Sequence, residues 1–143
     1  GKMSVSSKRK AKYASFTTLG KSIKQEEIKM GKKKNGGCAD AIAFISANYK
    51  VWYKMVDEMY EKVCYLINNA RDNDGEAQYW IAKANLENIG INGNPNNAFV
   101  AAQKAVNAGY TKGYYILGKC YKNGKGCLKD KEKAKEYLHN GMM

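Results

Sequence analysis

The sequence predicts an all-α protein made of helical hairpins, and three observations support that prediction. A helix, loop, helix pattern fills Gly113 to Leu138, its landmarks recur 36 residues upstream, and apolar residues step by threes and fours from Ile42 to Ile67. With 143 residues, 44% of them hydrophobic and only one a proline, the chain is long enough for a single domain with a core.

The segment from Gly113 to Leu138 contains the clearest hairpin. One stripe of its first helix comprises Tyr115, Leu117, Gly118, Cys120 and Tyr121. Gly118 is small enough to let a neighbouring helix approach closely. Gly124 and Gly126 can adopt positive φ and end this helix, and Asp130 is a suitable N-cap for the second helix. The apolar side of that second helix comprises Ala134, Tyr137 and Leu138.

The same landmarks are found when the sequence is shifted by 36 residues. The class of residue is kept where packing requires it, although few pairs are identical. The aligned pairs are Ala77 with Gly113, Tyr79 with Tyr115, Ile81 with Leu117, Ala82 with Gly118, Gly90 with Gly126, Asn94 with Asp130, and Ala98 with Ala134.

This pattern resembles the Sel1-like repeat, a relative of the tetratricopeptide repeat, over residues 75–141. The later unit supplies Tyr115, Leu117, Gly118, Tyr121, Gly124, Gly126, Asp130, Lys133, Ala134 and Tyr137, and the earlier unit supplies Ala77, Tyr79, Ile81, Gly90, Ala98, Lys104, Ala105 and Gly109. Asn85 departs from the usual tyrosine, Asn88 from the first loop glycine, and Ala101 from the aromatic residue. The resemblance implies a short right-handed α-solenoid of repeats at 75–110 and 111–143, which holds another protein as an adaptor or scaffold.

Residues 38–74 match the repeat pattern only weakly. Ala41, Ile45, Ser46 and Tyr49 fall on repeat positions, but no helix breaker stands between Val51 and Glu58. The segment is therefore either a degenerate repeat or an N-terminal capping helix. Because apolar residues continue at helical spacing, we favour one long capping helix from Asp40 to about Ala70.

The first 37 residues form a separate basic tail, expected to be largely disordered on its own. They contain eleven of the 25 Lys and Arg residues against two glutamates, so this quarter of the chain holds nine of the twelve excess positive charges. The tail could contact the phosphates of RNA or DNA or another acidic surface, or it could serve as a solubiliser or a localisation address. The candidate polyanion-binding residues are Lys8, Arg9, Lys10, Lys12, Lys32, Lys33 and Lys34.

Neither catalysis, a cofactor nor a metal is expected from the sequence. The lone histidine, His139, lies near the C-terminus, and no pair of carboxylates stands out as an acid and a base. The four cysteines have no Cys-x-x-Cys spacing, which disfavours zinc and favours buried free thiols in a reducing, intracellular compartment. No membrane-spanning run is present in the sequence, which favours a soluble chain.

A candidate partner-binding face lies on the first helices of the units. Phe44, Trp80 and Ile116 are equivalent at the 36-residue spacing and would form an apolar groove for a peptide or helix, unless another part of the chain covers them. Lys83, Tyr114 and Lys119 would surround that groove. The sequence thus predicts a protein-binding adaptor; the alternative is a nucleic-acid-associated protein, and self-association through the exposed ends of the solenoid is a third option.

Overall fold

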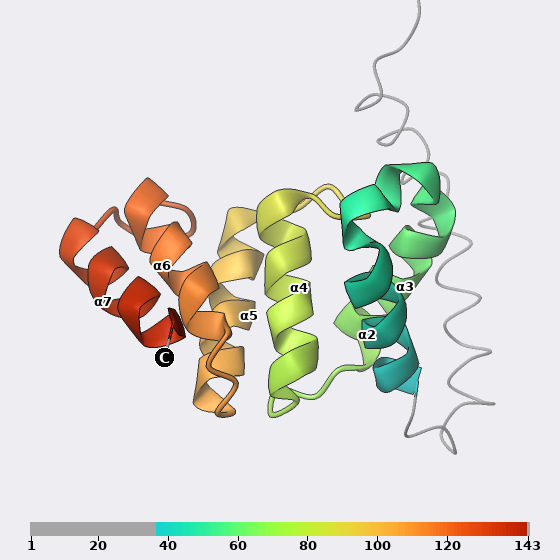
Figure 1. Ribbon diagram of the computed structural model, residues 1–143, viewed down its shortest axis with the longest axis horizontal. Helices are drawn as coiled ribbons and strands as arrows, with labels where there is room; N and C mark the ends of the chain where they lie inside the picture. The colour runs from blue at the N-terminus through green and yellow to red at the C-terminus, as the bar shows by residue number, and fades with distance from the viewer. Residues whose placement is uncertain (1–36, 143) are drawn as a thin grey trace, which may run out of the picture.

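The computed structural model describes residues 37–142, with side chains up to residue 140, and this part of the chain is entirely helical (Figure 1). The all-α prediction is confirmed for it. The elements are α2 (Gly37–Asn48), the 3-10 helix η1 (Tyr49–Lys54), α3 (Val56–Asn69), α4 (Gly75–Glu87), α5 (Pro95–Asn107), α6 (Gly113–Asn123) and α7 (Lys131–Met142).

The helices pair in chain order as three antiparallel hairpins, α2 with α3, α4 with α5 and α6 with α7. Figure 1 shows the hairpins side by side along the long axis of the molecule. The middle hairpin contacts both neighbours, because α4 packs on α2, α3 and α6 and α5 packs on α6. One core of buried side chains runs through the stack, from Ile45 on α2 through Ala82 on α4 to Ile116 on α6.

The loops of the second and third hairpins have the same backbone conformation. Gly124 and Gly126 have φ of 67° and 74°, which confirms the prediction of two positive-φ glycines, and Gly90 has φ of 72°. Asn88, which replaces the first loop glycine, also adopts the left-handed conformation with φ of 57°. Asparagine tolerates this region better than most residues, and the Asn88 side-chain oxygen accepts a bond from the Gly93 N–H at 2.8 Å.

The second helix of each of these hairpins begins at a side-chain N-cap. The Asn94 side-chain oxygen accepts bonds from the Asn96 and Asn97 N–H groups at 2.8 and 3.4 Å. The Asp130 carboxylate accepts a bond from the Lys133 N–H at 3.0 Å, which confirms its predicted role. Both caps satisfy backbone donors that have no partner within the helix.

Asn85, which lies 36 residues before Tyr121, ties the loop of the middle hairpin to α4. Its side chain is buried, donates to the Ile81 carbonyl at 2.9 Å and accepts from the Asn94 N–H at 3.1 Å. In the last hairpin the equivalent donor, the Asp130 N–H, bonds the backbone carbonyl of Tyr121 at 2.9 Å. The tyrosine side chain is therefore free to pack against aromatic neighbours.

The predicted close approach at Gly118 is confirmed, whereas one residue of the predicted apolar stripe lies outside. A Cβ on Gly118 would come within 2.6 Å of the Leu138 Cγ, so α6 and α7 cross at contact distance there. Leu117 and Cys120 are buried, but Tyr115 is 41% exposed.

The single capping helix predicted from Asp40 to about Ala70 is wrong. Helix α2 ends at Asn48, whose side-chain amide donates to the Phe44 carbonyl at 2.9 Å, and α3 begins at Val56 after the six residues of η1. Val51 has φ of −120° and ψ of 20°, outside the helical region. The break lets α3 fold back on α2, so that both helices bury their apolar stripes against each other.

The contact between neighbouring hairpins repeats with the 36-residue spacing of the sequence. A Cβ on Gly90 would lie 3.1 Å from the backbone carbonyl carbon of Met59, and a Cβ on Gly126 would lie 3.0 Å from that of Pro95. Each loop glycine thus rests on the first turn of the second helix in the preceding hairpin. Gly90 and Gly126 are 36 residues apart, as are Met59 and Pro95, so the first hairpin takes part in the same packing arrangement as the other two.

Candidate binding surface

A group of aromatic side chains extends from the first hairpin to the last. We call it the tyrosine band, and it comprises Tyr49, Tyr79, Trp80, Tyr110 and Tyr115. The Trp80 ring lies 5.4 Å from Tyr49 and 5.2 Å from Tyr79, centroid to centroid. The Tyr79 ring lies 5.4 Å from that of Tyr110, centroid to centroid, and the nearby Tyr115 makes a small contribution to the raised pKa of Tyr79. Such tilted and edge-on contacts stabilise the band and fix its rings.

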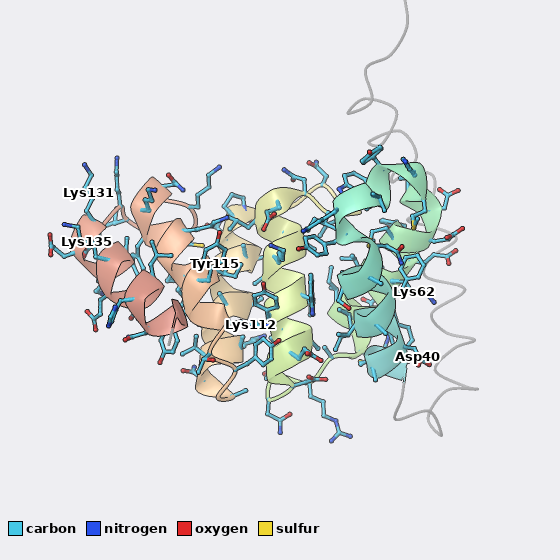
Figure 2. The ribbon with its side chains drawn as sticks, in the orientation of Figure 1. Asp40, Lys62, Lys112, Tyr115, Lys131 and Lys135 are labelled. Carbon is cyan, nitrogen blue, oxygen red and sulfur yellow. The ribbon has the colours of Figure 1, made fainter. Side chains whose placement is uncertain are left out.

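Lysines lie over the tyrosines at the ends of this band, and the Lys50 ammonium lies over Tyr49 at 5.8 Å from its centroid. The Lys83 ammonium is 5.2 Å from the centroid of Tyr49 and pairs with the Glu87 carboxylate at 2.7 Å. The Lys119 ammonium lies 4.5 Å from the centroid of Tyr115. Both arrangements have cation–π geometry, which restricts the lysines to the aromatic surface. Figure 2 shows Tyr115 in the middle of the molecule, on the side of α6 that faces α4.

The surroundings of Tyr79 and Tyr110 favour the neutral phenol and raise the pKa of each, and those of Lys83 favour its charged form. Burial, followed by the neighbouring Glu76 carboxylate, raises the pKa of Tyr110 to about 12; its hydroxyl donates to Glu76 at 3.3 Å. Burial also raises the pKa of Tyr79, against the opposing charge of Lys83. Burial alone would lower the pKa of Lys83, but its hydrogen bond to Glu87 raises it overall.

The side chains of this surface are of kinds that are common at recognition sites. Tyrosine rings offer apolar area at low entropic cost, and their hydroxyls can both donate and accept hydrogen bonds. Tyr115 is the most accessible member of the band at 41% exposed, and Tyr49 and Lys119 are half-buried. A partner that binds this face would first contact Tyr115, Lys119 and the exposed part of the Tyr49 ring.

The predicted ladder of Phe44, Trp80 and Ile116 belongs mostly to the core. Ile116 is completely buried and Trp80 is 9% exposed beneath Tyr49 and Tyr79. Phe44 is half-buried, and the Lys62 ammonium lies 5.9 Å from its ring centroid. The 36-residue spacing aligns the three positions, but the spacing does not reveal that other side chains cover them.

The three residues predicted to surround the groove separate in the structure. Lys83 and Lys119 lie over Tyr49 and Tyr115 of the tyrosine band. Tyr114 lies elsewhere, stacked on Tyr137 of α7 at 5.7 Å between centroids. Tyr137 in turn stacks on Tyr121, which meets Phe99 of α5. Tyr114 therefore joins the packing of the last hairpin onto the middle one.

Sequence reasoning missed the role of the tyrosines themselves. The 36-residue spacing already aligned Tyr79 with Tyr115, but these residues were interpreted as packing landmarks of the repeat. Tyr49 carried a weaker signal, since it lies in the segment where the repeat pattern fades. The seven basic residues proposed to bind polyanions, from Lys8 to Lys34, lie outside the described residues.

The cysteines are free in the structure. Cys120 is buried, and Cys38, Cys64 and Cys127 are half-buried. Burial, then the neighbouring Cys127, raises the pKa of Cys120 to about 11. Among residues 37–142, no three His, Cys, Asp or Glu side chains gather as metal ligands would. None of the helices in that range combines the length and apolar composition needed to cross a membrane.

Comparisons with known proteins identify no relative of this chain. No protein-family model matches it, and neither a curated protein nor a solved structure matches it.

Proposed function

We propose that the chain is a non-catalytic adaptor or scaffold, built as a short right-handed solenoid of Sel1-like repeats, and that it holds a protein segment on the tyrosine band. The observation that most supports this proposal is the repeated contact between hairpins. Gly90 on Met59 and Gly126 on Pro95 are the same backbone contact displaced by 36 residues. A contact that repeats with the sequence period is the defining property of a solenoid.

The same contact favours a degenerate repeat for residues 38–74. Met59 takes the place in the first hairpin that Pro95 takes in the second, although the first hairpin lacks a glycine loop. On this proposal the array has three units, and α2, α4 and α6 line one face. The tyrosine band runs along that face, where solenoids present residues to extended partners.

The adaptor proposal is tested by selecting binding peptides and then mutating the exposed part of the band. Peptides selected from a random displayed library on the full chain should lose binding when Tyr115→Ala and Lys119→Ala are combined. Trp80→Ala is unsuitable for this purpose, because truncation of a buried aromatic costs about 3 to 5 kcal/mol of stability. A matched control is Tyr53→Ala, which removes a tyrosine that is 58% exposed but lies outside the band.

The outcome distinguishes the band from other surfaces. Loss of affinity in the Tyr115→Ala, Lys119→Ala chain but not in Tyr53→Ala supports the proposal. Equal affinity of all three chains for every selected peptide would contradict the assignment of the band as the binding face.

A second candidate function is nucleic-acid association through the tail. The observation in its favour is the eleven Lys and Arg residues against two glutamates in residues 1–37. Fluorescence anisotropy of a labelled RNA and a labelled duplex DNA should show micromolar binding that weakens steeply with salt, since phosphate contacts release counterions. Replacement of the seven candidate polyanion-binding residues of the tail by glutamine should abolish this binding. Binding unaffected by this replacement would exclude the tail as the contact.

A further inference from the structure

The loop between α6 and α7 has an unusual surface. We call it the basic loop, and it comprises Lys122, Lys125, Leu128, Lys129 and Lys131. All five side chains are exposed, and Leu128 is 90% exposed, more than any other large apolar residue in the described part of the chain. The α6–α7 hairpin thus exposes an apolar side chain in a segment that carries four exposed lysines.

The fold does not require this composition. The equivalent positions of the preceding hairpin, 36 residues earlier, carry no charge: they are Leu86, Ile89, Asn92, Gly93 and Pro95. Both loops nevertheless have the same left-handed residues and the same bond back to the helix, from Ile89 to Ala84 at 3.0 Å and from Lys125 to Cys120 at 2.8 Å. Lys131 is moreover the first residue of α7, where a cation opposes the helix dipole.

The charges of the basic loop are not neutralised by nearby carboxylates. Residues 122–135 hold six lysines against Asp130 and Glu132, a net charge of +4. The Asp130 carboxylate is occupied by the N-terminal turn of α7. The ion pairs seen among residues 37–140 join Lys83 to Glu87 and Lys104 to Asp72, far from the loop in sequence.

The loop also lies at one end of the elongated molecule. Figure 2 shows Lys131 and Lys135 pointing outward at the end of the molecule opposite Asp40 and Lys62. Residues 37–111 hold eight carboxylates against six cations, a net charge of −2, whereas residues 112–143 hold eight lysines against three carboxylates, a net charge of +5. The last hairpin would therefore be the part of the described chain attracted to an anionic surface.

We propose that the basic loop is a contact site for an anionic lipid bilayer, with Leu128 entering the headgroup region and Lys122, Lys125, Lys129 and Lys131 facing lipid phosphates. Lysine supplies flexible point charges that suit a fluid layer of phosphates. An exposed leucine gains by leaving water for the acyl boundary, but it has no such gain on a phosphate backbone. The loop has neither arginine nor an aromatic ring, the residues that read and stack on nucleic acid.

This site involves no residue of the tyrosine band and does not rest on the proposed adaptor function. Its test must separate the basic loop from the basic tail. We would use the full chain with the ten basic residues from Lys8 to Lys34 replaced by glutamine in every arm. Binding would be measured by co-sedimentation with vesicles of phosphatidylcholine and phosphatidylserine, and with vesicles of phosphatidylcholine alone.

The chain is expected to bind the anionic vesicles at low salt and not the neutral ones. Leu128→Ser should weaken this binding about tenfold, whereas Leu128→Trp should keep or strengthen it. Lys125→Gln with Lys129→Gln should weaken it about 25-fold, at about fivefold per lysine. The control pair Lys50→Gln with Lys54→Gln removes exposed lysines of η1 and should have little effect.

Three results would overturn the proposal. The first is equal binding to neutral and anionic vesicles, or binding to neither. The second is a Leu128→Ser chain that binds as well as its parent, since Leu128 would then not enter the bilayer. The third is binding to duplex DNA or RNA that exceeds binding to anionic vesicles and depends on the same lysines. Because Leu128 and the four lysines substituted in the described part of the chain are exposed, circular dichroism should show each variant folded like its parent.

Discussion

Asn85 shows how one buried polar side chain can replace an aromatic residue of a repeat. Its amide bonds the Ile81 carbonyl and its oxygen accepts from the Asn94 N–H, so both ends of the side chain are satisfied inside the protein. The Gly93 backbone lies against the Asn85 carbonyl, so closely that any side chain on Gly93 would clash. A tyrosine at this position would have to displace that loop.

We expect Asn85→Ala to destabilise the fold by about 1 to 3 kcal/mol, because the bonds of a buried side chain would be lost and the Asn94 N–H would lose its acceptor in a partly buried loop. Urea denaturation followed by circular dichroism measures the free energy of unfolding. The control is Asn92→Ala in the same loop, an exposed residue whose change should stay within about 0.5 kcal/mol. Equal denaturation midpoints for the two variants would mean that the Asn85 hydrogen bonds contribute nothing to the free energy of unfolding.

Tyr110 should make the stability of the protein depend on alkaline pH. Its pKa is raised to about 12 in the folded protein by burial and by Glu76, against an ordinary value of 10.0. The folded state therefore favours the neutral phenol. This contribution to stability is complete below pH 10 and is lost as the pH rises from about 10 to 12.

The size of this effect is about 1 kcal/mol after allowance for solvent screening. Tyr110→Phe removes the ionising group. Between neutral pH and pH 12, the native chain should therefore lose about 1 kcal/mol more unfolding free energy than the Tyr110→Phe variant. Thermal melts across that pH range measure it. Parallel pH profiles for the two proteins would contradict the prediction, and Tyr79, whose pKa is also raised, affects both proteins alike.

At the scale of elements, the loop glycines determine how the hairpins meet. Gly90 and Gly109 both have positive φ, at 72° and 88°, but they differ in what surrounds them. A Cβ on Gly90 would lie 2.6 Å from the Met59 Cγ and 3.1 Å from its backbone, whereas one on Gly109 would meet nothing within 4 Å. The two positions separate the conformational cost of a side chain from its steric cost.

Gly109→Ala should destabilise the protein by about 1 kcal/mol, the cost of a left-handed alanine. Gly90→Ala should cost about 1 to 3 kcal/mol more, because the extra methyl forces the middle hairpin away from α3. Chemical denaturation of both variants provides the comparison. Should the two changes prove equal, the contact between Gly90 and Met59 would not restrain the hairpins.

The elements differ in how far the sequence predicts them. Helix ends at Gly124, Gly126 and Asp130 could be predicted, because glycine and aspartate act through local backbone chemistry. The break from Tyr49 to Met55 could not, because it contains no glycine or proline and its apolar spacing matches a continuous helix. Only the tertiary packing of α3 on α2 distinguishes a broken helix from a continuous one, and the apolar periodicity carries no information on that packing.

The candidate site was predictable to the same limited degree. The 36-residue spacing placed Phe44, Trp80 and Ile116 at equivalent positions, but which side chain covers which depends on contacts between hairpins. Tyr49 covers Trp80 only because the chain turns at η1. The tyrosine band is therefore a product of the stacking and is not visible in any one unit.

For the whole molecule, stability should decline from the centre to the ends. Helix α4 has nine buried residues and contacts both neighbouring hairpins, whereas in α7 only Ala134 is buried among the residues up to 140. In a stack where each hairpin touches only its neighbours, the terminal hairpins have one partner each. Opening should begin at an end that has little buried surface.

Hydrogen exchange tests this gradient. We expect the backbone amides of α4 and α5 to exchange most slowly, and those of α7 to exchange fastest among the helices. Mass spectrometry of proteolytic fragments resolves the helices well enough to rank them. Uniform protection from α2 to α7 would show instead that the three hairpins open as a single cooperative unit.

Gly90 packs on Met59 in the same way as Gly126 packs on Pro95. Because the contact repeats, whole hairpins could be added to the chain. A second copy of residues 77–112, inserted after Lys112, would bring its own glycine to the first turn of the existing α5 and offer its own proline turn to Gly126. Each junction would reuse a surface that the protein already has. The length of the array, and with it the span of any surface along the array, can therefore be changed in units of one hairpin while the two ends keep their present neighbours.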